Sequence, residues 1–160
     1  GCYTMLPEYN KILVAIDGSD ESEQAFKKAI QVAKRNNAIL YIAHIIDIRA
    51  FESVSSFDEN LAEEATRVAR DTLNNYLDYG KEHGVDDIQT IIEYGAPKTV
   101  ISKQLQKEYN IDLIMLGATG LNAMERILIG SVSSYVARHA ECDVLIVRTD
   151  LNNELPTKEK

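Results

Sequence analysis

The stretch Ile111-Asp-Leu-Ile-Met-Leu-Gly117-Ala-Thr-Gly120 decides the fold, and nine residues later the chain continues as Gly130-Ser131-Val132. This pattern predicts a buried strand, a glycine turn, an ordered loop and the start of a helix. Glycine accepts positive φ and lets a ligand approach closely because it has no Cβ. A helix N-terminus offers unpaired N–H groups and partial positive charge to anions. The stretch therefore predicts a phosphate-binding cradle.

Strand and helix patterns alternate along the rest of the chain. Strand patterns, several of them continuous apolar runs typical of strands buried on both faces, lie at residues 11–17, 38–47, 87–94, 111–116 and 144–147. Helical patterns lie at residues 20–36, 58–83 and 131–139 and in a segment that starts at Pro97. Residues 48–57 fit neither pattern and are expected to form a loop. This alternation predicts one α/β domain with a doubly wound, five-stranded parallel sheet and helices on both faces.

The order of the strands follows from where polar residues and glycines gather. Ligands in doubly wound sheets bind beyond the carboxyl ends of the strands, where the winding direction reverses. The first and fourth strands carry the informative ends, Asp17 and Gly117. If these two strands are neighbours at the reversal, the order is 3-2-1-4-5, and we predict that order.

The long helix predicted for residues 58–83 carries an apolar face that we expect to pack on the sheet. Its members are Leu61, Ala65, Val68, Ala69, Thr72, Leu73, Tyr76 and Gly80. Within the helix after Pro97, the inward residues are expected to be Val100, Ile101 and Leu105.

The folded domain is predicted to span residues 11–148. Residues 1–10 are expected to be a disordered or cloning-derived N-terminus, with Met5 as a natural start. Residues 149–160 are expected to form a polar C-terminal tail that frays from residue 151 onward.

Composition excludes several classes of partner. The 160 residues contain 17 Lys and Arg against 25 Asp and Glu, a formal net charge of −8. Such a balance argues against nucleic acid and against an anionic membrane surface. No apolar run approaches the roughly 18 residues of a membrane helix. With only Cys2 and Cys142, no disulfide framework emerges, and the cytoplasm is the expected compartment.

Several nucleotide and hydrolase motifs are missing from the sequence. There is no Walker-type P-loop, no Gly-x-Gly-x-x-Gly after the first strand and no Gly-x-Ser-x-Gly elbow. Taken singly, the remaining features have plainer interpretations: Asp17 ends a strand and caps a turn, and Gly130-Ser131 opens an ordinary helix. His44, inside a strand, is expected to be a packed and hydrogen-bonded histidine. Only the joint pattern favours phosphates.

The joint pattern, Gly117-x2-Gly120-x9-Gly130-Ser131, resembles the glycine signature of the ATP-binding branch of the universal stress protein family. Further resemblance lies at residues 12–19, 43–45 and 144–147, so that it runs from about residue 11 to residue 148. The chain departs from the family at Asp143, where relatives often have proline, and at Thr119, where many have another polar residue. The resemblance implies a fold like that of the adenine nucleotide alpha-hydrolases.

The resemblance also implies ATP as the ligand. The implied ATP-binding residues are Ala15, Ile16, Asp17, Ile45, Leu116, Gly117, Gly120, Gly130, Ser131 and Val132. Asp17 would lie on the adenine or ribose side with Ala15 and Ile16 nearby, and Ile45 would offer backbone groups to the adenine edge. Leu116 and Gly117 would pass under the ribose. The N–H groups of the last four residues of the list, together with the Ser131 hydroxyl, would face the phosphates.

Three further residues are candidates for phosphate contact: Thr119, Arg126 and Ser133. Arg126 either pairs with Glu125 at the surface or reaches a phosphate. No residue is assigned as a direct metal ligand, and Mg²⁺ is expected to bind through the ATP phosphates.

The sequence favours a protein that holds ATP over an enzyme that turns it over. Fast phosphoryl transfer needs a held metal and charge stabilisation at the γ-phosphate, yet no lysine and no clear acidic metal ligand lies beside the glycines. No catalytic residue is therefore assigned, and we expect a stress-response or regulatory module. A slow ATPase or an autophosphorylating protein, with Ser131 or Ser133 as acceptor, and an interaction module without nucleotide stay open.

The sequence of the last predicted strand indicates a second copy of this chain as a partner. Val144, Leu145, Ile146 and Val147 would form an apolar, uncharged edge, and such edges invite pairing. We predict a homodimer in which two such strands pair antiparallel across a two-fold axis, as relatives do. Cover by the C-terminal tail is the alternative.

Overall fold

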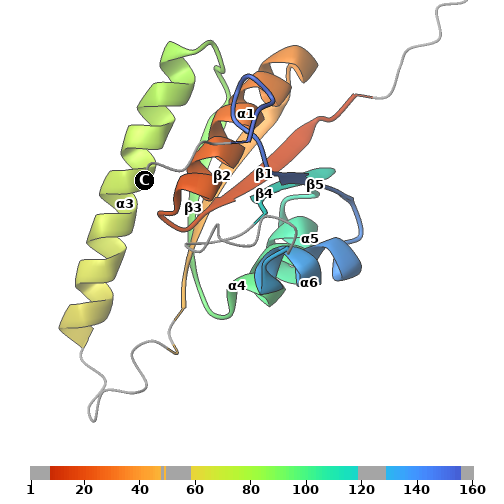
Figure 1. Ribbon diagram of the computed structural model, residues 1–160. Helices are drawn as coiled ribbons and strands as arrows, with labels where there is room; N and C mark the ends of the chain where they lie inside the picture. Colours follow the sequence, from red (N-terminus) through yellow and green to blue (C-terminus); the bar gives the residue numbers. More distant parts are fainter. Residues whose placement is uncertain (1–7, 48, 50–58, 119–128, 156–160) are drawn as a thin grey trace, which may run out of the picture.

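The computed structural model describes residues 8–47, 49, 59–118 and 129–155. Within these residues, five strands form one parallel sheet in the order β3-β2-β1-β4-β5 (Figure 1). The strands are β1 (Lys11–Ile16), β2 (Ile39–Ile46), β3 (Ile88–Tyr94), β4 (Leu113–Gly117) and β5 (Asp143–Val147). The predicted fold class and strand order are confirmed. The predicted loop at residues 48–57 lies, apart from Arg49, outside the described residues.

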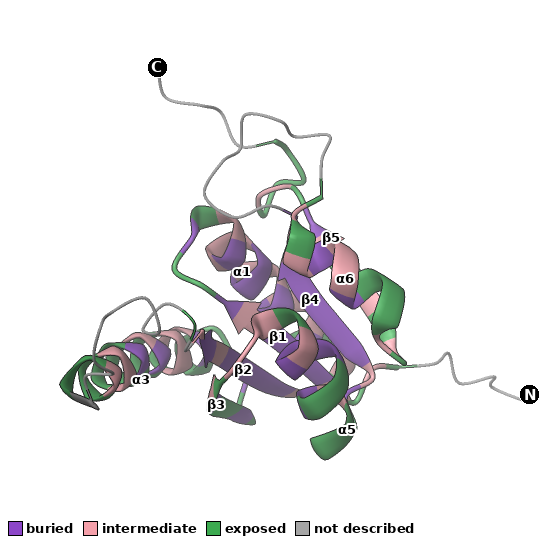
Figure 2. Ribbon diagram, turned by 90° about the horizontal axis from the view of Figure 1, so that it is seen from below, coloured by how far each residue is buried: buried purple, intermediate pink, exposed green. Residues whose placement is uncertain are grey.

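Helices cover both faces of the sheet. They are α1 (Asp20–Asn36), α3 (Glu59–Glu82), α4 (Pro97–Thr99), η1 (Val100–Leu105), α5 (Gln106–Glu108) and α6 (Ser131–His139). Helices α1 and α3 lie on one face, and the α4–η1–α5 segment and α6 lie on the other (Figures 1 and 2). In Figure 2, strands β2 and β4 are buried between these layers.

Alternate residues of the strands feed two separate cores. Ile12 and Val14 of β1 join the core under α1 and α3, whose largest buried aromatic residue is Phe26. Leu13, the residue between them, joins the core under η1 and α6. A sheet buried on both faces explains why β1, β2 and β4 have continuous apolar sequences.

The strand register positions the functional edge of the sheet. Val14 of β1 lies opposite Met115 of β4, and Ile16 lies opposite His44 of β2. The loop after β1, which starts at Asp17, therefore emerges beside Gly117 at the end of β4. The chain leaves β1 toward β2 on one side while β4 lies on the other, so this is the point where the winding reverses.

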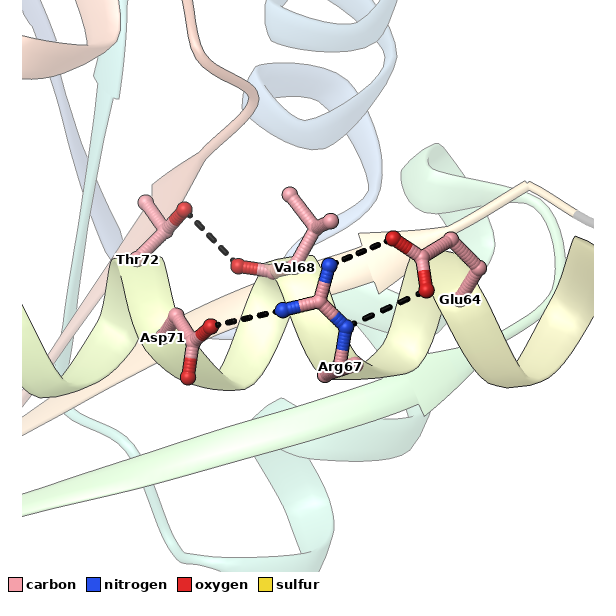
Figure 3. A network of polar contacts seen from close by, with 5 residues as sticks. All are labelled: Glu64, Arg67, Val68, Asp71 and Thr72. Atoms are coloured by element: carbon pink, nitrogen blue, oxygen red, sulfur yellow. Dashed lines mark hydrogen bonds and ion pairs between the residues drawn. The ribbon is translucent and has the colours of Figure 1, made fainter.

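The predicted apolar face of α3 is only partly correct. Leu61 and Val68 are 43% and 49% exposed, whereas Ala69, Leu73 and Gly80 are buried against the sheet side. On the outer face, Arg67 bridges Glu64 and Asp71 beside Val68 (Figure 3). Leu61 and Val68 lie on the helix surface beside the stripe of buried residues that includes Ala69 and Leu73. Both stripes have helical spacing, so the spacing of apolar residues alone does not say which stripe faces the sheet.

Both ends of the described chain are tied to the domain. The Tyr9 N–H donates to Asn36 Oδ1 at 3.0 Å, and the Tyr9 hydroxyl donates to Asp143 Oδ2 at 2.7 Å where β5 begins. At the other end, Lys28 Nζ of α1 donates to Thr149 Oγ1 at 2.6 Å and to Asn153 Oδ1 at 2.9 Å. Tyr9, Thr149 and Asn153 thus make hydrogen bonds to the rest of the domain. The predicted disordered N-terminus and frayed tail fall partly on residues 1–7 and 156–160, outside the described residues, and stay predictions. None of the described helices is long and apolar enough to span a membrane.

Candidate nucleotide site

A cavity of about 280 Å³ lies at the carboxyl ends of β1 and β4. This size is near the lower end of the roughly 300–1,000 Å³ of small-molecule sites. Its walls are formed by Ala15, Ile16, Asp17, Ser19, Ser22, Ile45, Pro97, Ile101, Leu116, Gly117, Gly130, Ser131, Val132 and Ser133. Every predicted site residue that the structure describes is on this wall. Thr119, Gly120 and Arg126 lie outside the described residues.

Four residues of the wall were missed by sequence reasoning. Ser19 and Ser22 belong to the first turn of α1, and Pro97 and Ile101 belong to the segment that follows β3. A signal for the serines was present, since Asp17-Gly18-Ser19 marks a turn that leads into a capped helix. For Pro97 the signal was its position after a strand of a parallel sheet, because all strands end at the same edge.

The N-terminus of α1 is closed by its own side chains. Ser19 Oγ accepts a hydrogen bond from Ser22 N at 3.2 Å and donates to Asp17 Oδ1, which also accepts from Ser19 N at 2.9 Å. Ser22 Oγ donates to the Ser19 carbonyl at 2.9 Å and accepts from Asp17 N at 3.3 Å. Ser19 and Ser22 are buried, so this network fixes the loop after β1 and leaves Asp17 exposed at the cavity.

The N-terminus of α1 is also negatively charged. Its first turn carries Asp20, Glu21 and Glu23. Carboxylates at this position interact favourably with the helix dipole and repel a second anion. The start of α1 is therefore unsuited to phosphate, although it lies on the wall of the cavity.

The N-terminus of α6 is open. Gly130 is its N-cap and makes no side-chain cap, and the first turn contains no acidic residue. The first hydrogen bond of the helix runs from Ser134 N to Gly130 O at 2.9 Å. The N–H groups of Ser131, Val132 and Ser133 donate to no described residue, as expected for the first turn of a helix without a cap. All three residues line the cavity, and helix N-termini with such N–H groups are common anion sites.

Two expected phosphate contacts have other partners in the structure. The N–H of Gly130 donates to the Ala118 carbonyl at 2.7 Å, so the expectation that this group faces a phosphate is corrected. The Ser133 hydroxyl, which is buried, donates to the Gly117 carbonyl at 2.7 Å. Both bonds tie the start of α6 to the end of β4. At the cavity wall, Gly130 thus leaves space because it has no side chain, and Ser133 offers its backbone N–H in place of its hydroxyl.

Gly117 is needed for packing. A Cβ at this position would lie 2.8 Å from the backbone carbon of Glu21 and 2.9 Å from its carbonyl oxygen. Real Cβ atoms do not approach backbone so closely, so only glycine lets the end of β4 lie against the first turn of α1. The sequence pattern predicts a turn and close ligand approach at Gly117, and the structure adds close packing of β4 against α1.

Two other polar residues have structural tasks. His44 Nδ1 lies 3.1 Å from the Ile16 carbonyl, which can only accept, so His44 links β2 to the end of β1 as a packed histidine. Burial raises the pKa of the Cys142 thiol to about 11, so this cysteine is a small apolar residue at neutral pH. Among the described residues, no group of three His, Cys, Asp or Glu side chains is placed to hold a metal ion.

Comparison with known proteins identifies the family. Residues 8–148 match the universal stress protein family. A universal stress protein of Staphylococcus aureus (strain USA300) is 48% identical over 148 residues, which cover 92% of this chain and 87% of the relative. The structure of the universal stress protein UspA from Lactobacillus plantarum is 31% identical, covers 89% of this chain and 100% of its own, and has a TM-score of 0.78. A universal stress protein crystallised in complex with cAMP is 32% identical, covers 89% of this chain and 99% of its own, and has a TM-score of 0.71. The chain belongs to the universal stress protein family.

Proposed function

We propose that the protein is an ATP-binding regulatory module of the universal stress protein family. The observation that carries this proposal is the open start of α6 at one wall of the cavity, with three N–H donors that have no acceptor among the described residues. A phosphate group supplies the acceptors that this helix end lacks. The chain as a whole carries a net charge of −8, so the site attracts an anion by local dipoles rather than by overall charge.

The two helix starts at the cavity define how the nucleotide would lie. Phosphates belong at α6, because the first turn of α1 is acidic and capped by Ser19. The base and ribose then belong toward Asp17, Ala15 and Ile45. One oxygen of Asp17, Oδ2, has no hydrogen-bond partner among the described residues, and it can accept from a ribose hydroxyl.

The relatives support an adenine nucleotide as the ligand class. The universal stress protein crystallised with cAMP is 32% identical to this chain. Whether the resident ligand is ATP or another adenine nucleotide is decided by the experiment below. Mg²⁺ bound through the phosphates is part of this proposal, because this metal often binds substrate phosphates with few protein ligands. A cytoplasmic location also stays a prediction.

Holding ATP is favoured over turnover. The described part of the cavity wall carries no lysine or arginine to stabilise charge at a γ-phosphate. For autophosphorylation, Ser131 is exposed at the first position of α6, whereas the Ser133 hydroxyl is buried and bonded to Gly117. If the protein phosphorylates itself, Ser131 is thus the acceptor that the geometry favours.

We also propose that the protein is a homodimer joined through β5. This strand is an edge of the sheet, and Leu145, on it, is 42% exposed. The turn at residues 149–154 is tied to Lys28 of α1, which supports an uncovered β5. Light scattering should give a dimer for the wild type and a monomer for Leu145→Lys, because a charge blocks edge pairing. A monomeric wild type at high concentration contradicts this proposal.

The test of nucleotide binding pairs two valine substitutions on the same helix. Gly130 has φ −61° and ψ 161°, a conformation that any residue adopts, so Gly130→Val adds a side chain at the open end without backbone strain. Ala140, the C-cap of α6, has φ −66° and ψ 144°, and Ala140→Val is the matched control at the other end of the same helix. We expect calorimetry to show ATP binding by the wild type and by Ala140→Val, and none by Gly130→Val.

Further measurements separate the alternative functions. Mass spectrometry of small molecules released from the freshly purified protein identifies the resident nucleotide. Steady phosphate release that is lost in Gly130→Val would make the protein a slow ATPase. Unchanged ATP affinity in Gly130→Val refutes the site, and no binding of ATP or cAMP by the wild type would leave an interaction module without nucleotide.

A further inference from the structure

The segment after β3 adds a wall to the cavity that neither the glycine signature nor the other strands supply. Pro97 begins this segment and Ile101 lies one turn later, and both line the cavity. Ile101 is 2% exposed and belongs to the same core cluster as Ile45 and Leu116, which also line the cavity. The wall is therefore anchored in the core.

The hydroxyls of this segment are already committed to its own backbone. Ser102 Oγ donates to the Lys98 carbonyl at 2.6 Å, and Thr99 Oγ1 donates to the Ala96 carbonyl at 3.1 Å. The lysines of the segment are also engaged, because Lys98 and Lys103 lie over the ring of Tyr135 with Nζ at 5.1 and 5.7 Å from its centroid. What the segment presents to the cavity is apolar.

A second observation singles out Ile101. Residues 100–105 form a π-helical turn in what the sequence predicts as an ordinary helix. Such turns are rare and are frequently found at functional sites. Ile101 lies inside this wide turn, on the side of the segment that meets the cavity.

We propose that Pro97 and Ile101 form the wall that contacts the nucleobase, and that Ile101 sets the preference of the site for a ligand that carries a base. This inference rests on the proposed function, since it names the residues that bind one part of the same nucleotide. Phosphates bind at the N–H groups of α6, and the apolar face of a planar base packs on an apolar wall. Ile101 is thus a specificity residue and takes no part in holding phosphate.

The test compares ATP with ribose 5-triphosphate, which has the same phosphates and sugar but no base. Ile101→Ala should lower the affinity for ATP by about tenfold, the effect of removing apolar contact from a specificity pocket. The affinity for ribose 5-triphosphate should stay unchanged. Ile101→Val, a milder truncation that keeps the core filled, should give an intermediate loss for ATP alone. Calorimetry supplies the affinities, and circular dichroism checks that each variant is folded.

Leu105→Ala is the control. Leu105 is 0% exposed, lies in the same π-helical turn and does not line the cavity, so its truncation disturbs the core without touching the base. It should change the two affinities by the same factor or by none. The proposal is overturned if Ile101→Ala or Ile101→Val weakens both ligands equally, or if Leu105→Ala weakens ATP selectively. A wild type that binds neither ligand would instead defeat the proposed function.

Discussion

Helices α1 and α6 begin at the same cavity, yet their first turns differ in capping and in charge. The start of α1 is capped by Ser19 and carries three acidic residues, Asp20, Glu21 and Glu23. The start of α6 has Gly130 as its cap, with no side-chain hydrogen bond and no acidic residue. The N–H groups at the start of α1 are capped by the chain's own side chains, whereas those of Ser131, Val132 and Ser133 at the start of α6 have no acceptor among the described residues.

This difference shows that two helix N-termini at one cavity can differ in whether the protein itself caps their N–H groups, and the proposed phosphate site rests on the uncapped one. The dipole and the free N–H groups are common to all helices, so their presence at α6 says little alone. What distinguishes α6 is a glycine cap without a side chain, which costs about a few tenths of a kcal/mol of helix stability relative to a capping side chain. Under the proposed function, the contrast within one cavity predicts that the anionic end of the ligand lies at α6.

The largest expected effect comes from closing the open end. Gly130→Asp supplies α6 with a charged cap that occupies its N–H donors and repels phosphate, so ATP affinity should fall by at least about 100-fold. Stability should stay the same or rise by a few tenths of a kcal/mol, because Asp is a better cap than Gly. Calorimetry and thermal denaturation measure the two quantities on one sample.

Gly130→Asn is the matched control for charge. It offers a neutral cap of the same shape, so its ATP affinity should also fall, but by less than that of Gly130→Asp. If Gly130→Asp binds ATP as tightly as the wild type, the open end of α6 is not where phosphate binds, and the comparison between the two helices loses its functional meaning.

The next effect concerns the contact that holds the two helix starts in place. Gly117→Ala puts a Cβ 2.8 to 2.9 Å from Glu21 backbone atoms, and we expect a loss of about 1–3 kcal/mol of stability from overpacking. Urea denaturation measures it. Gly130→Ala, in which the backbone is unstrained, should cost far less. Equal stability of wild type and Gly117→Ala would mean that β4 and α1 move apart at no cost.

A smaller effect is expected when the N-cap of α1 is removed. Ser19→Ala removes the cap of α1 and one partner of Asp17, and it should cost about 1 kcal/mol of stability. ATP affinity should change little, since the acidic first turn stays. Ser19→Thr keeps the hydroxyl and should restore most of the stability. An increase in ATP affinity as large as the loss in Gly130→Asp would show that the cap, and not the charge, excludes phosphate from α1.

Much of the fold could be predicted because apolar runs and turn residues report local structure directly. The doubly wound sheet and its order followed from strand-like runs such as residues 11–17 and from the idea that Asp17 and Gly117 end neighbouring strands. The face of α3 could not be settled in this way, because Leu61 and Val68 lie in a row beside the packed one. The π-helical turn at residues 100–105 was also invisible, since its residues have ordinary helical spacing.

The site could be predicted only in part, and the reason is that hydrogen bonds between distant residues leave no local pattern. The glycine signature predicted that residues near Gly117 and Gly130 gather with those near Asp17. It could not predict that Gly130 N–H donates to Ala118, or that the Ser133 hydroxyl donates to Gly117. Pro97 and Ile101 were missed because the signature draws attention to α6, while the wall they form comes from the crossover after β3.

The smallest effect, and the one that most sharpens the comparison, has opposite signs on stability and on binding. Asp20 is exposed in the first turn of α1. Asp20→Asn removes a favourable interaction with the dipole and should cost about 0.3–1 kcal/mol of stability at low ionic strength. The same change weakens the repulsion between α1 and the phosphates, so ATP affinity should rise slightly. Both shifts should disappear in about 1 M salt, where charges at the surface are screened within roughly 3 Å.

Asp86→Asn is the control for this last experiment. It makes the same change in net charge, and Asp86 is exposed just before β3, at the amino edge of the sheet and away from the cavity. It should leave ATP affinity unchanged. If Asp20→Asn and Asp86→Asn raise ATP affinity equally, the nucleotide responds only to the net charge of −8. If Asp20→Asn lowers the affinity instead, the Asp20 carboxylate makes a favourable contact with the ligand, and the repulsion assigned to the first turn of α1 is wrong.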